Sequence, residues 1–293
     1  MREQLIQKTV EVLENNDFDI LLYLHSSLDI AAQKKSFQML IKILENIDGF
    51  RKEHADELKR LSSYLNSYPL LIGETTKAER MADDTIYDRH GISSITIATL
   101  ENSLEGAYPD KVSSKGRLIA NIDGSVLEDY RKKKDLTLDD LAEEIKLTKE
   151  SIYLYEHERM RVKYEIAKRI EEFLHASLIT PKSPFITQEK QEPKPTTDLE
   201  KKLFLFDFEV YPFHKLDFDI GAKDKRDKLI VRETPHGDMS NAIRFSNFFK
   251  TFLAIVSEKK VKNIPVIPKE EFMAVGSKRE LVRLIREKSA LNN

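Results

Sequence analysis

The sequence predicts an α/β plus all-α fold in which two α/β lobes with mixed sheets flank a helical domain. Short apolar runs typical of buried strands alternate with amphipathic helices over residues 1–115, the first lobe, and again over 199–293, the second lobe. Closely spaced amphipathic helices occupy 118–178, the helical domain. The segment 179–198 carries four prolines among polar residues, which predicts an extended linker before the second lobe.

Composition and charge are typical of a cytoplasmic globular protein. The 293 residues leave room for two or three domains, and a content of 40% hydrophobic and 33% charged residues excludes a disordered chain. The absence of cysteine excludes disulfides, thiolate metal sites and cysteine nucleophiles. No stretch approaches the roughly 18 uninterrupted apolar residues of a membrane span, so we expect no membrane association. The net charge of −2 means that any nucleic-acid site must be local.

The first lobe is predicted to alternate helices and strands. An amphipathic helix over about 5–13 is followed by short buried strands within 18–33 and 37–44. A second helix follows over about 50–65, and 68–73 is another buried strand. A polar stretch then precedes "GISSITIATLENSLEG", which we interpret as a strand leading into a helix.

The second lobe follows the same order. After the linker, "EKKLFLFDFEV" has strand-like character, and a helix is expected over about 242–252. An ungapped offset of 190 places Asp219 against Asp29 and Arg232 against Lys42, and further on "FLAIVS" matches "YPLLIG". We interpret this as a duplicated lobe, and the alternative is chance similarity between two α/β lobes.

The stretch "LDIAAQKKSFQMLIKIL" resembles the metal-binding strand pair of PD-(D/E)xK nucleases, with Asp29 and Lys42 in place. Such nucleases need carboxylates to hold Mg²⁺ and a lysine to orient the nucleophile. The carboxylate expected two residues before the lysine is replaced by Leu40. We therefore expect two degenerate endonuclease-like lobes with no catalytic residue, no metal and no cofactor. The corresponding positions of the second lobe are Asp219, Ile230 and Arg232.

Other interpretations of these positions stay open. Glu11 and Glu14 on the first helix are candidate additional metal ligands, and Asp217 is a candidate in the second lobe. Asp29 is also explained as a strand-end aspartate with a local hydrogen bond, and Lys42 as a strand lysine with a buried stem. A third interpretation is that both bind a small ligand or a nucleic-acid phosphate without cleavage.

The helical domain carries two helix-start signals close together. Thr137 occupies an N-cap position with Asp140 three residues later, a capping-box arrangement with Asp in place of Glu. Thr148 begins the next helix. Two short helices joined by a turn of three to four residues have helix-turn-helix geometry. The residues expected to turn inward are Leu138, Leu141, Ala142, Ile145, Ile152 and Tyr155.

The segment "LTLDDLAEEIKLTKESIYLYE" resembles the phage-repressor and Cro-like (XRE) helix-turn-helix family. The resemblance implies that the recognition helix, residues 148–156, enters the major groove of double-stranded DNA. By position it assigns base-facing roles to Thr148, Lys149, Glu150, Ser151 and Tyr153, and phosphate contacts to Arg159, Arg161 and Lys163.

Two positions and the local charge depart from the pattern of that family. Lys146 stands where the turn usually has glycine, which costs little if the turn avoids positive φ. Leu138 replaces a glutamine, which removes one expected phosphate contact. From 125 to 176 there are 11 Lys and Arg against 13 Asp and Glu, whereas DNA-binding domains are usually locally basic. The alternative is a helical domain that docks proteins.

The order of motifs along the chain, with "LIKILENID" as its most specific part, resembles a family of archaeal HTH-type transcriptional regulators. The resemblance implies a sequence-specific DNA-binding regulator without catalytic activity. Because a single helix-turn-helix covers few base pairs, we expect a homodimer that reads two half-sites, with the lobes serving dimerisation or DNA grip. Two other classes stay open: a metal-dependent DNA nuclease or resolvase-like enzyme, and an adaptor that does not bind DNA.

Overall fold

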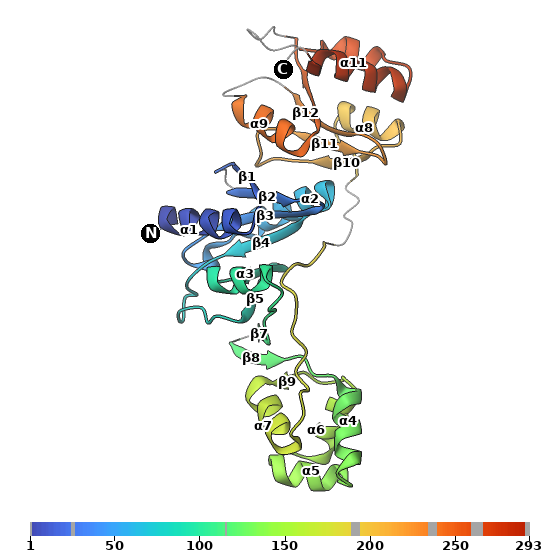
Figure 1. Ribbon diagram of the computed structural model, residues 1–293. Coiled ribbons are helices and arrows are strands. Elements are labelled where there is room, and N and C mark those ends of the chain that lie inside the picture. Colours follow the sequence, from blue (N-terminus) through green and yellow to red (C-terminus); the bar gives the residue numbers. More distant parts are fainter. Residues whose placement is uncertain are drawn as a thin grey trace. The chain divides into compact units, whose positions relative to one another are not determined.

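The computed structural model describes residues 2–24, 27–114, 116–188, 194–233, 239–258 and 266–290, and the chain forms two compact units (Figure 1). The first unit consists of Met1–Val12, Leu44–Gly49 and Leu70–Ile186. The second unit consists of Leu13–Ile43, Phe50–Pro69 and Thr187–Asn293. The first lobe contributes to both units, whereas the helical domain lies within the first unit and the second lobe within the second.

A mixed sheet forms the α/β part of the first unit. Its strands are β4 (Tyr68–Ile72), β5 (Thr85–Arg89), β6 (Ile92–Ile95), β7 (Lys111–Ser114), β8 (Arg117–Ala120) and β9 (Val162–Lys163), and α3 (Ile97–Leu104) follows β6. From Leu70 onward β4 pairs in parallel with β6, which pairs antiparallel with β5. The strand β5 pairs in parallel with β7, and β7, β8 and β9 continue the sheet with antiparallel pairs. The fold class predicted from the sequence is thus confirmed on the α/β side.

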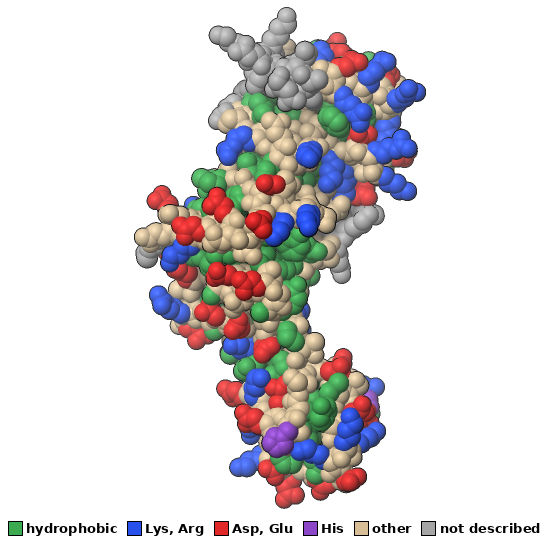
Figure 2. All heavy atoms as spheres, in the orientation of Figure 1, with side chains coloured by type: hydrophobic (Ala, Val, Ile, Leu, Met, Phe, Trp, Pro, Cys, Tyr) green, Lys and Arg blue, Asp and Glu red, His purple; other side chains and the backbone are tan. Residues whose placement is uncertain are grey.

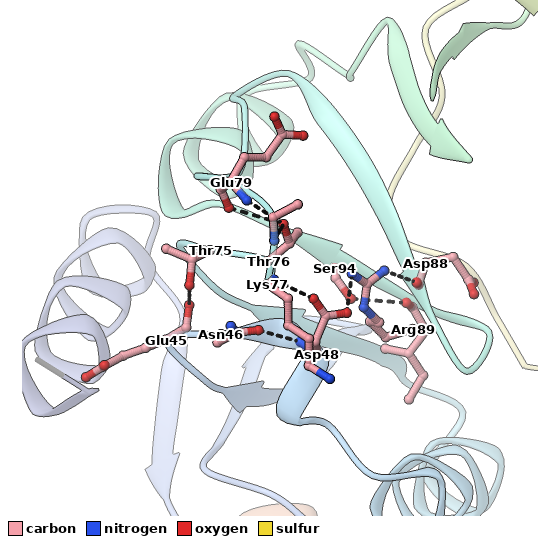
Figure 3. Close-up of polar contacts among 12 residues, drawn as sticks. Glu45, Asn46, Asp48, Thr75, Thr76, Lys77, Glu79, Asp88, Arg89 and Ser94 are labelled. Carbon is pink, nitrogen blue, oxygen red and sulfur yellow. Dashed lines mark hydrogen bonds and ion pairs between the residues drawn. The ribbon is translucent and has the colours of Figure 1, made fainter. Parts of the chain in front are cut away.

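A polar network orders the loop that precedes β5 (Figure 3). Asp48, in the short 3-10 helix Ile47–Gly49, accepts a hydrogen bond from the Lys77 N–H at 2.7 Å and pairs with Arg89 of β5 at 2.7 Å. These contacts lower the pKa of the Asp48 carboxyl, with the Lys77 N–H as the largest contribution. The polar stretch that the sequence presented as a separator is therefore an integral part of the fold and includes the strand β5.

Four helices form the helical domain: α4 (Gly124–Lys133), α5 (Leu138–Ile145), α6 (Lys149–Glu156) and α7 (Tyr164–Leu174). They enclose a separate apolar core in which Leu127, Leu141 and Ile152 are fully buried. The strand β9 directly precedes α7 and pairs with β8. A hydrogen-bonded ladder therefore joins the bundle to the sheet of the first unit (Figure 1).

The second unit combines part of the first lobe with the whole of the second lobe. The first-lobe part holds the end of α1 (Arg2–Asn15), the antiparallel strands β1 (Asp19–Leu22), β2 (Ile30–Lys34) and β3 (Phe37–Ile43), and α2 (Lys52–Leu65). The second lobe contains a sheet in the order β10-β11-β12-β13, antiparallel except for the parallel pair β12–β13. Its elements are α8 (Asp198–Leu205), β10 (Glu209–Pro212), β11 (Ile220–Lys223), β12 (Lys228–Glu233), α9 (Ser240–Phe249), β13 (Phe252–Val256), α10 (Lys269–Ala274) and α11 (Lys278–Ala290).

The two lobes share their strand register. Asp19 pairs with Gln33 in the first lobe and Glu209 with Lys223 in the second, which is a constant offset of 190. Asp17 and Asp207, at the same offset, both have φ of 59° and both follow a helix. At the end of the next helix the offset is 184. The Ser67 N–H donates to the Ser62 carbonyl in the first lobe, and the Thr251 N–H makes the same contact with the Ser246 carbonyl in the second. The two lobes therefore share strand register, with six residues fewer in the second lobe between β12 and the end of the following helix.

Two elements of the second lobe differ from the sequence-based expectation. The segment after the linker was expected to be strand-like, but Asp198–Leu205 is the helix α8. Its N-terminus carries a capping box between Thr197 and Glu200, a local helix signal that outweighs the apolar run. The helix expected over 242–252 is α9, which ends at Phe249 because Lys250 adopts a left-handed conformation.

Candidate nucleic-acid interface

The helix-turn-helix is built by local capping. The Thr137 hydroxyl accepts from the Asp140 N–H and the Asp140 carboxylate accepts from the Thr137 N–H, so the predicted capping box is confirmed. Thr148 caps α6 by accepting from the Ser151 N–H, also as predicted. Lys146 between the two helices has φ of 57°, so the condition under which this residue would cost little is not met. A left-handed conformation is strained for any residue with a Cβ atom.

The recognition helix α6 has a buried and an exposed face. Ile152 and Tyr155 are packed into the core, whereas Lys149, Glu150 and Tyr153 are exposed. The structure therefore brings the residues assigned to base contacts onto one surface of the first unit. Thr148, Arg159, Arg161 and Lys163 are exposed as well, and Ser151 is half-buried.

Several of these side chains already have contacts within the first unit. The hydroxyls of Thr148 and Ser151 lie 3.1 Å apart, and the Lys149 amine lies 3.7 Å from Asp139 of α5. Tyr153 packs on His157 with ring centroids 4.1 Å apart. The Arg161 guanidinium donates to the Ser114 hydroxyl at 3.4 Å. These contacts are exposed and weak, so little free energy is lost when they are broken.

A buried ion pair that the sequence pattern did not reveal fixes α6 to α4. Arg131 donates from Nε to Glu156 Oε1 at 2.6 Å and from Nη2 to Oε2 at 3.0 Å, and its Nη1 donates to the Leu136 carbonyl at 2.8 Å. The hydrogen bonds to Glu156 raise the pKa of the Arg131 guanidinium. Gly124, at the start of α4, leaves no room for a side chain, because a Cβ there would lie 2.3 Å from the Glu156 carbonyl oxygen. The recognition helix is thus held at its C-terminal end by two contacts with α4.

In the first lobe Asp29 and Lys42, the two positions that resemble those of a nuclease, pair with each other. Asp29 is fully buried, and it accepts from the Lys42 amine at 3.1 Å and from the Ile43 N–H at 2.8 Å. The strand register places Leu40 opposite Ala31. Ala31 follows Asp29 by two residues, so Leu40 lies on the same face of the sheet as Asp29, and it is fully buried. An apolar side chain therefore occupies the place where a nuclease has its second carboxylate.

The second lobe repeats this arrangement with an arginine. Asp219 accepts from the Glu233 N–H at 2.7 Å, matching the Asp29–Ile43 bond, and burial raises the pKa of the Asp219 carboxyl. Arg232 donates to the Asp217 carbonyl at 2.8 Å, so Asp217 contributes its backbone to this contact. Ile230, at the missing-acid position, is fully buried.

Metal ligation finds no support among the described side chains. No group of three or more His, Cys, Asp or Glu residues in the described ranges lies close enough to hold a metal ion. Glu11 and Glu14, considered as additional ligands, are exposed on α1, and Glu11 accepts from Gln7 of the same helix.

The lobes pack against each other within the second unit through pseudo-symmetric contacts. The helix α2 of the first lobe contacts β10 and β11 of the second, and α9 of the second lobe contacts β1 of the first. Lys223 donates to the Ser63 carbonyl on α2. Gln33 is the residue of the first lobe that corresponds to Lys223 at the offset of 190, and it donates to the Phe248 carbonyl on α9 at 3.3 Å. This exchange of equivalent contacts is typical of a two-fold dimer, here formed inside one chain.

The lobe contact covers the face of the second lobe that carries its vestigial nuclease positions. Gly221 lies on β11 two residues after Asp219, and a Cβ atom there would meet the Tyr64 ring of α2 at 3.1 Å. The Tyr64 hydroxyl donates to the Leu229 carbonyl at 2.8 Å, and the Asp217 N–H donates to the Tyr23 hydroxyl at 3.2 Å. Tyr64 and Tyr23 of the first lobe therefore lie against this part of the second lobe.

Two sequence families match separate parts of the chain. The PD-(D/E)XK superfamily domain matches residues 2–109, and a helix-turn-helix domain matches residues 127–179. No solved structure matches the chain. No helix among the described residues is long and apolar enough to cross a membrane.

Similar full-length proteins come from archaea and are named "Putative HTH-type transcriptional regulatory protein". One from Methanocaldococcus jannaschii is 29% identical over 98% of this chain and 97% of its own length. One from Methanothermobacter thermautotrophicus is 28% identical over 98% of this chain and 97% of its own length. One from Methanococcus maripaludis is 34% identical over 61% of this chain and 55% of its own length. The chain thus combines a PD-(D/E)XK superfamily domain with a helix-turn-helix domain and is similar, over nearly its whole length, to archaeal proteins that carry this name.

Proposed function

We propose that the chain is a transcriptional regulator that binds double-stranded DNA sequence-specifically through α6. The observation that carries this proposal is the division of α6 into a packed face, with Ile152 and Tyr155, and an exposed first turn with Lys149 and Glu150. The helix-turn-helix match and the names of the archaeal relatives support it.

The first turn of α6 offers side chains suited to base edges. Lys149 donates to guanine, Glu150 accepts from the cytosine amino group, and Ser151 serves either a base or a phosphate. Thr148 and Tyr153 border this surface, and the Tyr153 ring offers an apolar contact. Arg159, Arg161 and Lys163 follow α6 and bind phosphates, which fixes the register of the helix on the duplex.

The lobes serve this regulator without cutting DNA. Divalent-metal catalysis needs clustered carboxylates, and Leu40 and Ile230 supply none. The Asp29 carboxylate is engaged by Lys42 and Ile43, and the face that carries Asp219 is covered by α2. We expect no Mg²⁺- or Mn²⁺-dependent cleavage of duplex or branched DNA, and cleavage that disappears in Asp29→Asn would contradict this part of the proposal.

A second copy of the chain supplies the second helix-turn-helix. One such domain covers only a few base pairs, and regulators of this class read two half-sites about one or two helical turns apart. The lobe faces formed by β1, α2, β10 and α9 are already used within one chain, so the two copies associate through another surface. Light scattering on the protein with and without its binding site measures this association.

The test of sequence reading compares two variants on two duplexes. Lys149→Ala with Ser151→Ala removes two base-facing groups, and each good base contact contributes about 1–3 kcal/mol of discrimination. We expect the ratio of affinities for a selected and a scrambled duplex to fall at least tenfold. The matched control is Arg169→Ala on the exposed side of α7, which leaves the ratio unchanged. An unchanged ratio in the double variant would contradict the proposal and favour a protein-docking role for the helical domain.

A further inference from the structure

The two lobes carry opposite net charges that cancel in the whole chain. Residues 1–115 contain 14 Lys and Arg against 19 Asp and Glu, whereas 199–293 contain 19 against 14. Lobes with the same strand register therefore differ in net charge by ten. A shared fold does not require this difference, so the positions of the second-lobe cations are informative.

Much of the positive charge of the second lobe lies on α11. Leu281, Val282 and Ile285 are buried against the rest of the lobe. Arg279, Arg283 and Arg286 recur at helical spacing and are exposed, so they form one stripe along the helix. Figure 2 shows Lys and Arg side chains gathered over α8 and α11.

This stripe forms one wall of an open groove of about 1260 Å³. The other wall is the turn between β11 and β12, which contributes Arg226 between Asp224 and Asp227. Lys278 pairs with Asp224 at 2.6 Å and Arg286 pairs with Asp227 at 2.5 Å. These two ion pairs join α11 to the turn.

Three arginines of the groove are left for a ligand. Within the described ranges no carboxylate lies within ion-pair distance of Arg226 or Arg279. Arg283 lies 3.8 Å from Glu287, but both side chains are about 70% exposed, so this pair contributes little. Glu280 accepts from the Gly276 N–H at 3.1 Å and thereby serves the start of α11.

The groove is separate from the other features of the lobe. Lobe packing uses Lys223 and Lys228, which donate to carbonyls of α2. The vestigial pair Asp219 and Arg232 lies at the opposite end of the β11–β12 hairpin from the turn that lines the groove. Neither feature explains the three arginines.

We propose that the groove between α11 and the β11–β12 turn binds the phosphate backbone of duplex DNA without reading its sequence. This inference rests on the proposed function: the helical domain has more acidic than basic residues, so basic groups elsewhere in the chain add to the phosphate contacts of Arg159, Arg161 and Lys163. Guanidinium groups bind phosphate with two parallel hydrogen bonds, and an open groove lined by exposed arginines is accessible to a backbone strand.

The test removes two groove charges and, separately, two charges elsewhere on the same lobe. Arg279→Gln with Arg283→Gln is compared with Arg244→Gln and Lys250→Gln, which are exposed on α9 and at its C-terminal end, outside the groove. Each lost phosphate contact reduces the slope of log K against log salt by about 0.9 for duplex DNA, so the groove variant should lose about 2. Its affinities for selected and scrambled duplexes should fall by the same factor, whereas the control keeps the slope of the unmodified chain.

A variant that is expected to strengthen binding separates the loss of a phosphate contact from a folding defect, because a folding defect would only weaken binding. Glu287→Gln removes the carboxylate beside Arg283, so it should tighten binding to both duplexes. Thermal unfolding of all variants checks that the lobe is intact. A groove variant with unchanged slope and affinity, in a protein that still selects its site through α6, overturns this inference alone. An unmodified chain that binds no duplex at all overturns the proposed function and the groove together.

Discussion

Arg131 and Glu156, which lie 25 residues apart in the chain, form a buried bidentate ion pair that joins the first helix of the helical domain to the end of its recognition helix. The guanidinium also donates to the Leu136 carbonyl, so one side chain links α4, α6 and the segment that leads into α5. The position of α6 therefore depends on a buried contact at its C-terminal end.

Breaking this pair should lower the free energy of unfolding of the helical domain. Arg131→Ala leaves the Glu156 carboxylate buried without its partner, and losing one member of a buried pair typically costs about 3–5 kcal/mol. Urea denaturation followed by circular dichroism measures the change in the free energy of unfolding. Arg131→Met with Glu156→Leu should recover much of the loss, because it removes both charges. A single variant as stable as the unmodified chain would show that the pair is not structural.

Lys146 should be replaceable by glycine with a gain in stability. The residue has φ of 57°, a conformation that costs about 1 kcal/mol for a side chain with a Cβ atom and nothing for glycine. Lys146→Gly is therefore expected to raise the melting temperature of the helical domain. The matched control is Glu144→Gly in the same helix, where glycine should destabilise by about 1 kcal/mol. A loss of stability in both variants would contradict the left-handed turn.

Asp29 should matter for stability and not for cleavage. Asp29→Ala leaves the Lys42 amine buried without its carboxylate, which should cost about 3–5 kcal/mol. Asp29→Ala with Lys42→Met should be closer to the unmodified chain. Chemical denaturation gives these values, and an incubation with Mg²⁺ or Mn²⁺ and labelled duplex tests cleavage in parallel. Metal-dependent cleavage by the unmodified chain, lost in the single variant, would restore the nuclease interpretation.

Glu57 should control the packing of the two lobes. Its buried carboxylate accepts from the N–H groups of His214 and Lys215 at 2.7 Å each and pairs with Arg60 at 2.7 Å. Glu57→Ala leaves the two N–H groups without their acceptor, so hydrogen exchange at 214 and 215 should accelerate strongly. Glu53→Ala, on the exposed side of the same helix, is the control and should leave this exchange unchanged. Unchanged exchange in Glu57→Ala would mean that the lobes pack without this contact.

Features that depend on neighbouring residues could be predicted from the sequence. The caps at Thr137 and Thr148 are local hydrogen bonds between residues three apart, so their residue types suffice. The proximity of Asp29 and Lys42 was implied by the resemblance of their segment to the metal-binding strand pair of PD-(D/E)xK nucleases, and the two side chains pair in the structure. The same logic failed at α8, where an apolar run was given more weight than the capping residues Thr197 and Glu200.

Features that depend on distant residues could not be predicted in this way. The Arg131–Glu156 pair joins side chains from two helices that are 25 residues apart in the chain, and no local sequence pattern indicates such a contact. The strand β5 was missed because its five residues lie in a polar stretch and are held by Arg89 and Asp48, which meet only in the folded chain. The groove of the second lobe needs both α11 and the β11–β12 turn, although the spacing of the arginines on α11 is visible in the sequence.

Selection of binding sites from a random duplex library with the purified full-length chain tests the central claim most directly. We expect a recovered pool with a shared palindromic motif, whose affinity falls steeply with salt at a log-log slope on the order of −5 or steeper. A pool with no enriched motif would contradict sequence-specific DNA binding through α6 and leave the helical domain as a protein-docking module.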